Sequence, residues 1–213
     1  MDPISLIRRI LPAIVSQIGD EQDGGSSPAP SFGSAPSGGS APTSGGKGGG
    51  SFDPGPNKEL AEHKGSIDKA ASISGLDPNL IGAQVWAESR GDKGTKSTNK
   101  GDGHTDTGLM QISQERWENE IAPDLDPAER QKIVEQTGKQ PEELDMNDPE
   151  EGIIGGSLEM KSKIDECHGD VESALGYYQS GKKGSNIYSK NVMQYMEELQ
   201  NGEKLSEDPF GSP

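Results

Sequence analysis

The sequence has few of the side chains from which a large core is built. Aromatic residues make up 4% of its 213 residues, and apolar residues make up 28%. Its single cysteine, Cys167, excludes an internal disulfide. No run of 18 apolar residues is present, which excludes a typical membrane-spanning helix. The three histidines lack the spacing of a metal site, and neither a Walker motif nor a dinucleotide-binding fingerprint occurs. We therefore expect neither a metal nor a cofactor.

Basic residues are also scarce. Lysine and arginine together number 20, against 36 aspartates and glutamates, so the net charge is −16. A nucleic-acid partner needs clustered Lys and Arg to contact phosphates, and we expect no such partner. A polysaccharide partner remains compatible with this charge.

The apolar residues are unevenly distributed along the chain. Residues 24–46 contain no charged side chain and consist of Gly, Ser, Pro, Ala, Thr and one Phe. Such a segment buries too little surface to offset its chain entropy, so we interpret residues 20–57 as a flexible linker. Residues 58–202 hold enough apolar side chains for one modest domain. We expect residues 203–213 to form a disordered tail.

Residues 1–19 carry an amphipathic stripe that precedes the linker. The apolar positions follow helical spacing at Ile4, Ile7, Leu11, Ile14 and Ile18. The segment makes a poor signal peptide because an acidic residue leads it, a proline interrupts it and no clear cleavage site follows. Three interpretations are open: a short helix packed on the domain, a helix that docks to a partner protein, or a membrane-surface anchor.

The domain itself shows helical patterns and no convincing strand pattern, so we predict a mainly α fold. Gly75 ends a first helix, Asp77 caps a second and Pro78 occupies its first position. The expected helices are 58–74, 78–90, 109–119, a short one within 126–138, 149–166, 170–178 and 186–199. The acidic, proline-interrupted segment 120–147 is either a lid or a solvated insertion, and we favour the insertion.

One carboxylate lies in an unusual position on the second helix. Ile81, Val85 and Glu88 are spaced i, i+4 and i+7, so Glu88 continues the inward-facing apolar stripe. Burial and the negative end of the helix dipole both raise the pKa of a carboxyl group there. We interpret Glu88 as a general acid near neutral pH. The alternative is a glutamate that bends to solvent at a frayed helix end.

Three short motifs follow one another: AESR at 87–90, GLMQI at 108–112 and ALGYYQSG at 174–181. Together they resemble the lysozyme-like lytic transglycosylases of the soluble lytic transglycosylase domain family. That family combines Glu-Ser, Gly-Leu-Met-Gln-apolar, Ala-Tyr-Asn-Ala-Gly and a late tyrosine. The resemblance covers roughly residues 65–200 and implies a lysozyme-like catalytic domain.

The resemblance implies a peptidoglycan glycan strand as substrate. It implies cleavage of the β-1,4 bond between N-acetylmuramic acid and N-acetylglucosamine, with Glu88 as acid and base and a 1,6-anhydro product. The substrate-binding residues it implies are Ser89, Gly108, Leu109, Met110, Gln111, Tyr178, Gln179 and Tyr188. Gln111 should contact the sugar, since an amide both donates and accepts hydrogen bonds; a core amide bonded to the backbone is the alternative.

Two of these residues raise further questions. Tyr178 has a hydroxyl that would contact Glu88 or the sugar, with core packing as the alternative. Gln179 departs from the family's asparagine by one methylene.

Hydrolysis is the rival reaction. The loop GDGHTDTGLMQ resembles that of goose-type lysozymes, in which a Gly-Asp pair lies six residues before the glycine of GLMQ. Asp102 matches that aspartate and becomes a second catalytic candidate, associated with the attacking water, although a further aspartate of those enzymes is Ser113 here. Asp102 and Asp106 are also typical turn residues. A third hypothesis is a non-catalytic wall-binding or assembly module, against which the intact Glu88 argues.

The resemblance also implies that the protein acts in the bacterial cell wall or periplasm. Its loop is similar to those of specialised transglycosylases of secretion machines and of phage virions. No signal peptide is evident, so we expect delivery by a virion, a secretion apparatus or a holin.

Overall fold

The chain folds mainly into helices, as the sequence predicts, and the computed structural model describes residues 50–98 and 105–212. The α-helices are α2 (Lys58–Ala61), α3 (Lys64–Ser74), α4 (Pro78–Ser89), α5 (Gln114–Arg116), α6 (Pro127–Thr137), α7 (Pro149–Glu166), α8 (Val171–Ser180) and α9 (Ile187–Gln200). Shorter turns of π- or 3₁₀-helix are η2 (Trp117–Ile121), η3 (Ala122–Asp124) and η4 (Pro141–Glu143). The expected helix within residues 1–19, most of the linker and Asp102 lie outside the described residues.

Two short strands join the helices. β1 (Lys96–Thr98) pairs antiparallel with β2 (Thr105–Thr107), with Ser97 opposite Asp106. The sequence pattern predicts no strand here, because three residues are too few to show a two-residue alternation.

Local capping groups explain where the main helices begin. The Asp77 side chain accepts a hydrogen bond from Asn79 N at 2.8 Å, and Pro78 occupies the first turn of α4. The next long helices begin in the same way, with caps at Asp148, Asp170 and Asn186. The predicted starts of these helices are therefore confirmed, whereas the expected helix 58–74 is divided into α2 and α3.

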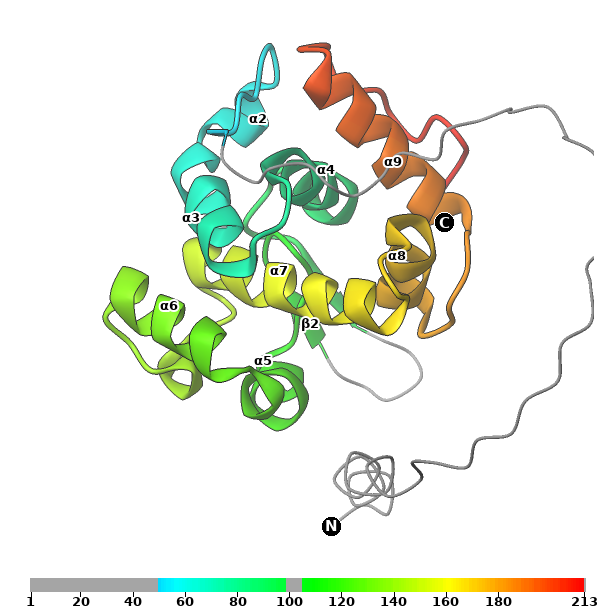
Figure 1. Cartoon of the computed structure of the whole chain (residues 1–213). Helices are drawn as coiled ribbons and strands as arrows, with labels where there is room; N and C mark the ends of the chain where they lie inside the picture. The colour runs from blue at the N-terminus through cyan, green and yellow to red at the C-terminus, as the bar shows by residue number, and fades with distance from the viewer. Residues whose placement is uncertain (1–49, 99–104, 213) are drawn as a thin grey trace, which may run out of the picture. The chain divides into compact units, whose positions relative to one another are not determined.

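The core lies where the longer helices pack on one another. Helix α3 packs on α7, α4 packs on α9, and α8 contacts both α7 and α9 (Figure 1). Ile81 and Val85 of α4 are fully buried, as their place on the apolar stripe predicts. This packing directs one face of α4 toward the interior and brings its last turn close to α9. Among the described residues, no helix is long and apolar enough to cross a membrane.

The expected helix 109–119 does not form over its first half. Residues 109–112 make a turn in which Gln111 has a left-handed φ of 47°, and α5 begins only after Ser113, whose hydroxyl accepts a hydrogen bond from Arg116 N. Leu109, Met110 and Ile112 are all buried. Their helix-like apolar spacing arises because different parts of the domain cover them, not because they share one helical face.

The segment 120–147 is neither a lid nor a solvated insertion. Ile133, Leu144 and Met146 are buried in the core. Lys132 Nζ donates to the carbonyl of Ile73 on α3, and Trp117 Nε1 donates to the carbonyl of a proline in η4. This part of the expectation is wrong because α6 and its flanking turns cover apolar surface on α3 and α7.

The packed domain extends beyond the expected limits of 58 and 202. Phe52 is 1% exposed, and its ring lies so close to Gly82 that a Cβ there would meet it at 2.7 Å. Asn57 accepts a hydrogen bond from Leu205 N at 2.9 Å, and Leu205 is itself buried. Residues 51–57 therefore do not belong to the linker, nor does Leu205 belong to a disordered tail, because the two segments pair with each other over α4 and α9.

Candidate active site

Glu88 lies in the last turn of α4, where the apolar stripe of that helix ends. Its side chain is half-buried. Tyr188, near the start of α9 and 4% exposed, donates a hydrogen bond from Oη to Glu88 Oε1 at 2.6 Å. The contact joins residues one hundred positions apart, and it exists because α4 packs on α9. The tyrosine hydroxyl that bonds to Glu88 is therefore that of Tyr188, whereas the sequence suggested Tyr178 for this contact.

The surroundings of Glu88 bring the pKa of its carboxyl group close to neutral pH. Burial raises the pKa of Glu88 to about 7; the hydrogen bond from Tyr188 opposes this rise, and the charges of Asp106 and Glu159 add to it. A carboxyl group with this pKa carries a proton in a large fraction of molecules at pH 7, and loses it readily. It is suited to act first as an acid and then as a base.

The turn 108–112 is fixed against α4 and α8 rather than open to solvent. Ser89 Oγ lies 3.1 Å from the carbonyl oxygen of Leu109, and Tyr178 Oη donates to the carbonyl of Met110 at 2.8 Å. Leu109 and Met110 are at most 1% exposed. Their side chains cannot reach a ligand, which corrects the expectation that they bind substrate. Ser89 and Tyr178 hold the turn in place through its backbone.

Gln111 occupies the next position of this turn, and its amide is engaged within the protein. Its Nε2 donates to Gly108 O at 2.8 Å and to Thr95 O at 3.1 Å, while its Oε1 accepts from Ser97 Oγ at 2.8 Å. Gly108 has a φ of 74°, which favours glycine. The geometry therefore favours the alternative in which the Gln111 amide bonds within the protein. Gln111 fastens the turn 108–112 to β1 and to the residue that precedes it.

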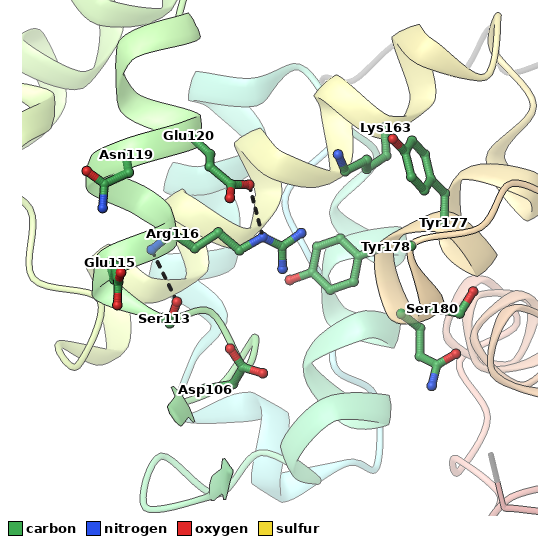
Figure 2. A pocket seen from close by; sticks show the side chains of 12 residues that line it. Asp106, Ser113, Glu115, Arg116, Asn119, Glu120, Lys163, Tyr177, Tyr178 and Ser180 are labelled. Atoms are coloured by element: carbon green, nitrogen blue, oxygen red, sulfur yellow. Dashed lines mark hydrogen bonds and ion pairs between the residues drawn. The ribbon is translucent and has the colours of Figure 1, made fainter. Parts of the chain in front are cut away.

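A pocket of about 570 Å³ lies between β2, α5, η2, α7 and α8 (Figure 2). Its lining includes Asp106, Arg116, Lys163, Tyr178 and Gln179, and Figure 2 shows Arg116 extending from α5 toward Tyr178. Two lining residues connect the pocket to Glu88. The charge of Asp106 raises the pKa of Glu88. The pKa of Tyr178 is raised mainly by burial, and the charge of Glu88 adds to this rise. Glu88 itself is not among the residues that line this pocket, and it acts on the pocket through its electrostatic contacts with Asp106 and Tyr178.

The remaining expected residues take mixed positions. Gln179 is exposed, lines the pocket, and accepts a hydrogen bond from Asn186 Nδ2 at 3.1 Å. Asp102 lies outside the described residues, so its expected place near an attacking water stays a prediction. Asp106, which the sequence suggests only as a turn residue, is one of two acidic side chains whose charge acts on Glu88, and Glu159 is the other.

Two charged residues of the site were missed from the sequence. Arg116 of α5 forms an ion pair with Glu159 of α7, which is 2% exposed. Burial raises the pKa of Glu159 to about 7, and the charge of Arg116 opposes the rise. The sequence contains one signal for Glu159, which is the only carboxylate within the apolar run IIGGSLEM. A carboxylate in such a run is expected to be buried, and a buried carboxylate requires a partner. Nothing in the sequence indicates which arginine or lysine provides it.

The described residues contain no group of three or more His, Cys, Asp or Glu arranged to hold a metal ion.

Comparison with known protein families matches most of the domain that the structure describes. The model of the transglycosylase SLT domain matches residues 65–201, a range that contains Glu88, the turn 108–112, Tyr178 and Tyr188. No curated protein and no solved structure matches the chain. The matched range covers more than half of the chain, and it contains the half-buried glutamate at the end of α4 and its tyrosine partner. The chain therefore belongs to the transglycosylase SLT domain family, the peptidoglycan lytic transglycosylases that act on the bacterial cell wall.

Proposed function

We propose that the protein cleaves the β-1,4 bond between N-acetylmuramic acid and N-acetylglucosamine with Glu88 as both acid and base, and that it releases a 1,6-anhydro product. The observation that carries this proposal is the arrangement of Glu88 itself. It is half-buried and in electrostatic contact with Asp106, which lines the pocket; its pKa is raised to about 7, and Tyr188 donates to one of its oxygens at 2.6 Å. A single carboxyl group with these properties suits a reaction in which the same group first donates a proton to the substrate and later accepts one from it.

In the first step, protonated Glu88 donates its proton to the oxygen that bridges the two sugars. The bond from C1 of N-acetylmuramic acid to that oxygen breaks, and the N-acetylglucosamine part leaves as an alcohol. The substrate's own N-acetyl oxygen stabilises the cationic C1, as in substrate-assisted glycosidases. The hydrogen bond from Tyr188 stabilises the Glu88 carboxylate that this step creates.

In the second step, the Glu88 carboxylate accepts the proton of the muramoyl 6-hydroxyl. O6 bonds to C1 and closes the anhydro ring, which returns Glu88 to its protonated form. No water is consumed. The pocket, with aromatic and amide side chains such as Tyr177 and Gln179, supplies surfaces on which the rest of the glycan strand would lie.

Hydrolysis is the second candidate, and the position of Asp106 favours it. A carboxylate in the pocket whose charge acts on Glu88 could orient a water on C1. Asp102 would serve the same purpose in the goose-type arrangement. The two reactions differ in their products, which makes them separable by one measurement.

We expect purified protein to release muropeptides with 1,6-anhydro ends from isolated sacculi. Because the ring closes without water, these ends are one water lighter than reducing ends, and a digest in H₂¹⁸O should leave them unlabelled. Mass spectrometry of the digest measures both properties, with Glu88→Gln protein as the blank. Reducing ends that carry ¹⁸O, and that disappear with Asp102→Asn or Asp106→Asn, would establish hydrolysis instead.

We also propose that residues 1–49 serve delivery by a virion or a secretion apparatus, or docking through the stripe 3–18, rather than catalysis. Every residue assigned to the site follows residue 80, whereas Phe52 and Asn57 belong to the packed domain. Deletion of 1–49 should therefore leave activity on purified sacculi largely intact.

Deletion of 1–57 is the matched comparison. It should lower the melting temperature, since loss of a buried Phe costs about 3 kcal/mol. Loss of sacculus-degrading activity after the shorter deletion would place part of the catalytic unit before residue 50.

A further inference from the structure

Residues 205–211, which we call the C-terminal strap, follow α9 and run back along it (Figure 1). The strap lies beyond residue 201, at which the family match ends. Its backbone bonds to side chains of two helices. Trp86 of α4 donates from Nε1 to the carbonyl of Ser206 at 3.2 Å, and Asn191 of α9 accepts from Phe210 N at 2.9 Å. The strap therefore joins α4 to α9.

Arg90, which caps the end of α4, is the point at which the strap and both helices meet. Its Cζ atom lies 5.3 Å from the centre of the Trp86 ring and 5.5 Å from that of Tyr195 on α9. One guanidinium nitrogen forms an ion pair with Asp208 of the strap. The other donates to Tyr195 Oη at 3.3 Å and to the carbonyl of Trp86 at 3.1 Å. Arg90 thus contacts aromatic rings of two helices and the carboxylate of the strap.

The hydroxyl of Tyr195 completes this junction. Tyr195 is fully buried, and its Oη donates to Asp208 Oδ1 at 3.2 Å and accepts from Asp208 N at 3.0 Å and from Arg90. One donated and two accepted bonds use the full capacity of a phenol hydroxyl. Asp208 has a left-handed φ of 40°, a conformation that persists in a non-glycine residue where surrounding contacts hold it. Both the backbone and the side chain of Asp208 are therefore fixed on one hydroxyl.

Glu88 lies midway between the two α4 residues that this junction holds. Trp86 and Arg90 are i, i+4 neighbours, and Glu88, two positions from each, points to another side of the helix. The last carbonyls of a helix lack partners within it, so its last turn frays unless other contacts satisfy them. Here the carbonyl of Trp86 accepts from the backbone nitrogen of Arg90 at 3.0 Å as well as from its guanidinium. The junction therefore secures the turn that carries Glu88.

The contacts on α9 lie on the face that carries Tyr188. Tyr188, Asn191 and Tyr195 are spaced i, i+3 and i+7, and all are at most 4% exposed. The strap bonds to the second and third of these residues, while the first donates to Glu88 at 2.6 Å. The strap thus connects the α9 face that holds Tyr188 to the end of α4 that holds Glu88.

We propose that the C-terminal strap is a positioning element that keeps Glu88 buried against Tyr188. Asp208 is its central positioning residue, because it joins Arg90 at the end of α4 to Tyr195 of α9. Without these bonds the last turn of α4 loosens and Glu88 turns toward solvent. The inference rests on the proposed role of Glu88 as acid and base.

Asp208→Gly tests this proposal, with Asp208→Asn as the conservative variant. Glycine adopts the left-handed φ without strain but removes the carboxylate, whereas asparagine keeps an oxygen that accepts from Arg90 and Tyr195. In Asp208→Gly we expect kcat on soluble glycan strands to fall at least ~10-fold, because a general acid acts only when it is correctly placed. KM should change little, since no described residue of the strap lines the pocket. Asp208→Asn should keep a kcat close to that of the wild type.

The titration of Glu88 reports its position without requiring catalysis. It is followed by ¹³C NMR of the carboxyl carbon and assigned by the absence of the signal in Glu88→Gln. Burial is the largest cause of the raised pKa of Glu88, so this pKa should fall from about 7 toward 4.5 in Asp208→Gly. Asp208→Asn should leave it unchanged, which separates loss of contact from loss of charge. Glu207→Gln, at the exposed neighbouring position of the strap, is the matched control and should change neither kcat nor the titration.

Tyr195→Phe is the second variant, used if Asp208→Gly does not fold. It removes the shared hydroxyl with little change of shape, and it should move kcat and the pKa of Glu88 in the same directions.

A folded Asp208→Gly protein with wild-type kcat and a Glu88 pKa near 7 would overturn the inference. Equal losses in Asp208→Gly and Asp208→Asn would overturn it as well, and so would a lower kcat with an unchanged titration. A lower pKa with unchanged kcat would support the strap but remove Glu88 from catalysis. Full activity of Glu88→Gln would likewise remove the proposed function alone, because the titration measures the strap independently.

Discussion

Glu88→Gln is expected to reduce the cleavage of purified sacculi by at least ~100-fold, the usual scale for loss of a general acid. Glutamine has the same shape and still accepts the hydrogen bond from Tyr188, but it holds no transferable proton. Turbidity clearance by the purified variant measures the effect. Glu197→Gln, an exposed glutamate of α9, is the matched control and should keep full activity.

The same variant should gain stability at alkaline pH. The pKa of Glu88 is raised from 4.5 to about 7, so the native state holds this proton more tightly than the unfolded state. The free energy of unfolding therefore falls as pH rises from about 4.5 to about 7, and it stays low above that range. Glutamine has no such loss, and the gain at pH 8 is at most about 3 kcal/mol.

Urea unfolding of both proteins at pH 5 and pH 8 measures this gain. A folded Glu88→Gln protein that clears sacculi as fast as the wild type would exclude Glu88 as the acid. A variant that is inactive and also unstable at pH 8 would mean that the carboxylate stabilises the fold, contrary to its raised pKa.

Arg116→Met is expected to lower the free energy of unfolding by about 3–5 kcal/mol at pH 8, because it leaves Glu159 buried without its counter-charge. Glu159 is 2% exposed, its Oε2 already has no partner among the described residues, and Arg116 provides its ion pair. At pH 5 the loss should be smaller, since the pKa of Glu159 lies at about 7 even with Arg116 present and the carboxyl is then neutral.

The second partner of Arg116 provides a control. Glu120 lies 3.8 Å from Arg116 Nε and is largely exposed, so Glu120→Gln should leave the unfolding midpoint unchanged. The double variant Arg116→Met, Glu159→Met should recover much of the loss, because two apolar side chains replace a buried pair. Equal destabilisation by Arg116→Met at pH 5 and pH 8 would show that the arginine acts through packing rather than charge.

Several parts of the fold follow from short stretches of sequence. Asp77 followed by Pro78 determines the start of α4, and Asp148, Asp170 and Asn186 do the same for later helices. The inward position of Glu88 follows from its spacing to Ile81 and Val85. These features are predictable because the interacting groups lie within one or two turns of the same helix.

The turn 108–112 shows where such reasoning fails. Leu109, Met110 and Ile112 have the spacing of a helix, yet the left-handed φ of Gln111 and hydrogen bonds to Thr95 and Ser97 make a turn. The partners of Gln111 come from another segment. Its amide was therefore expected to face the sugar, although it fastens the loop.

The sequence by itself indicated the family, the starts of several main helices and the inward position of the Glu88 carboxylic acid. The tertiary structure decided which tyrosine touches that acid, since Tyr178 and Tyr188 lie on different helices and only the packing of α4 on α9 brings Tyr188 to 2.6 Å. It likewise decided that Arg116 pairs with Glu159 and that Phe52 and Leu205 belong to the core. Contacts of this kind join residues far apart in the chain, and their partners depend on how whole helices pack rather than on local spacing.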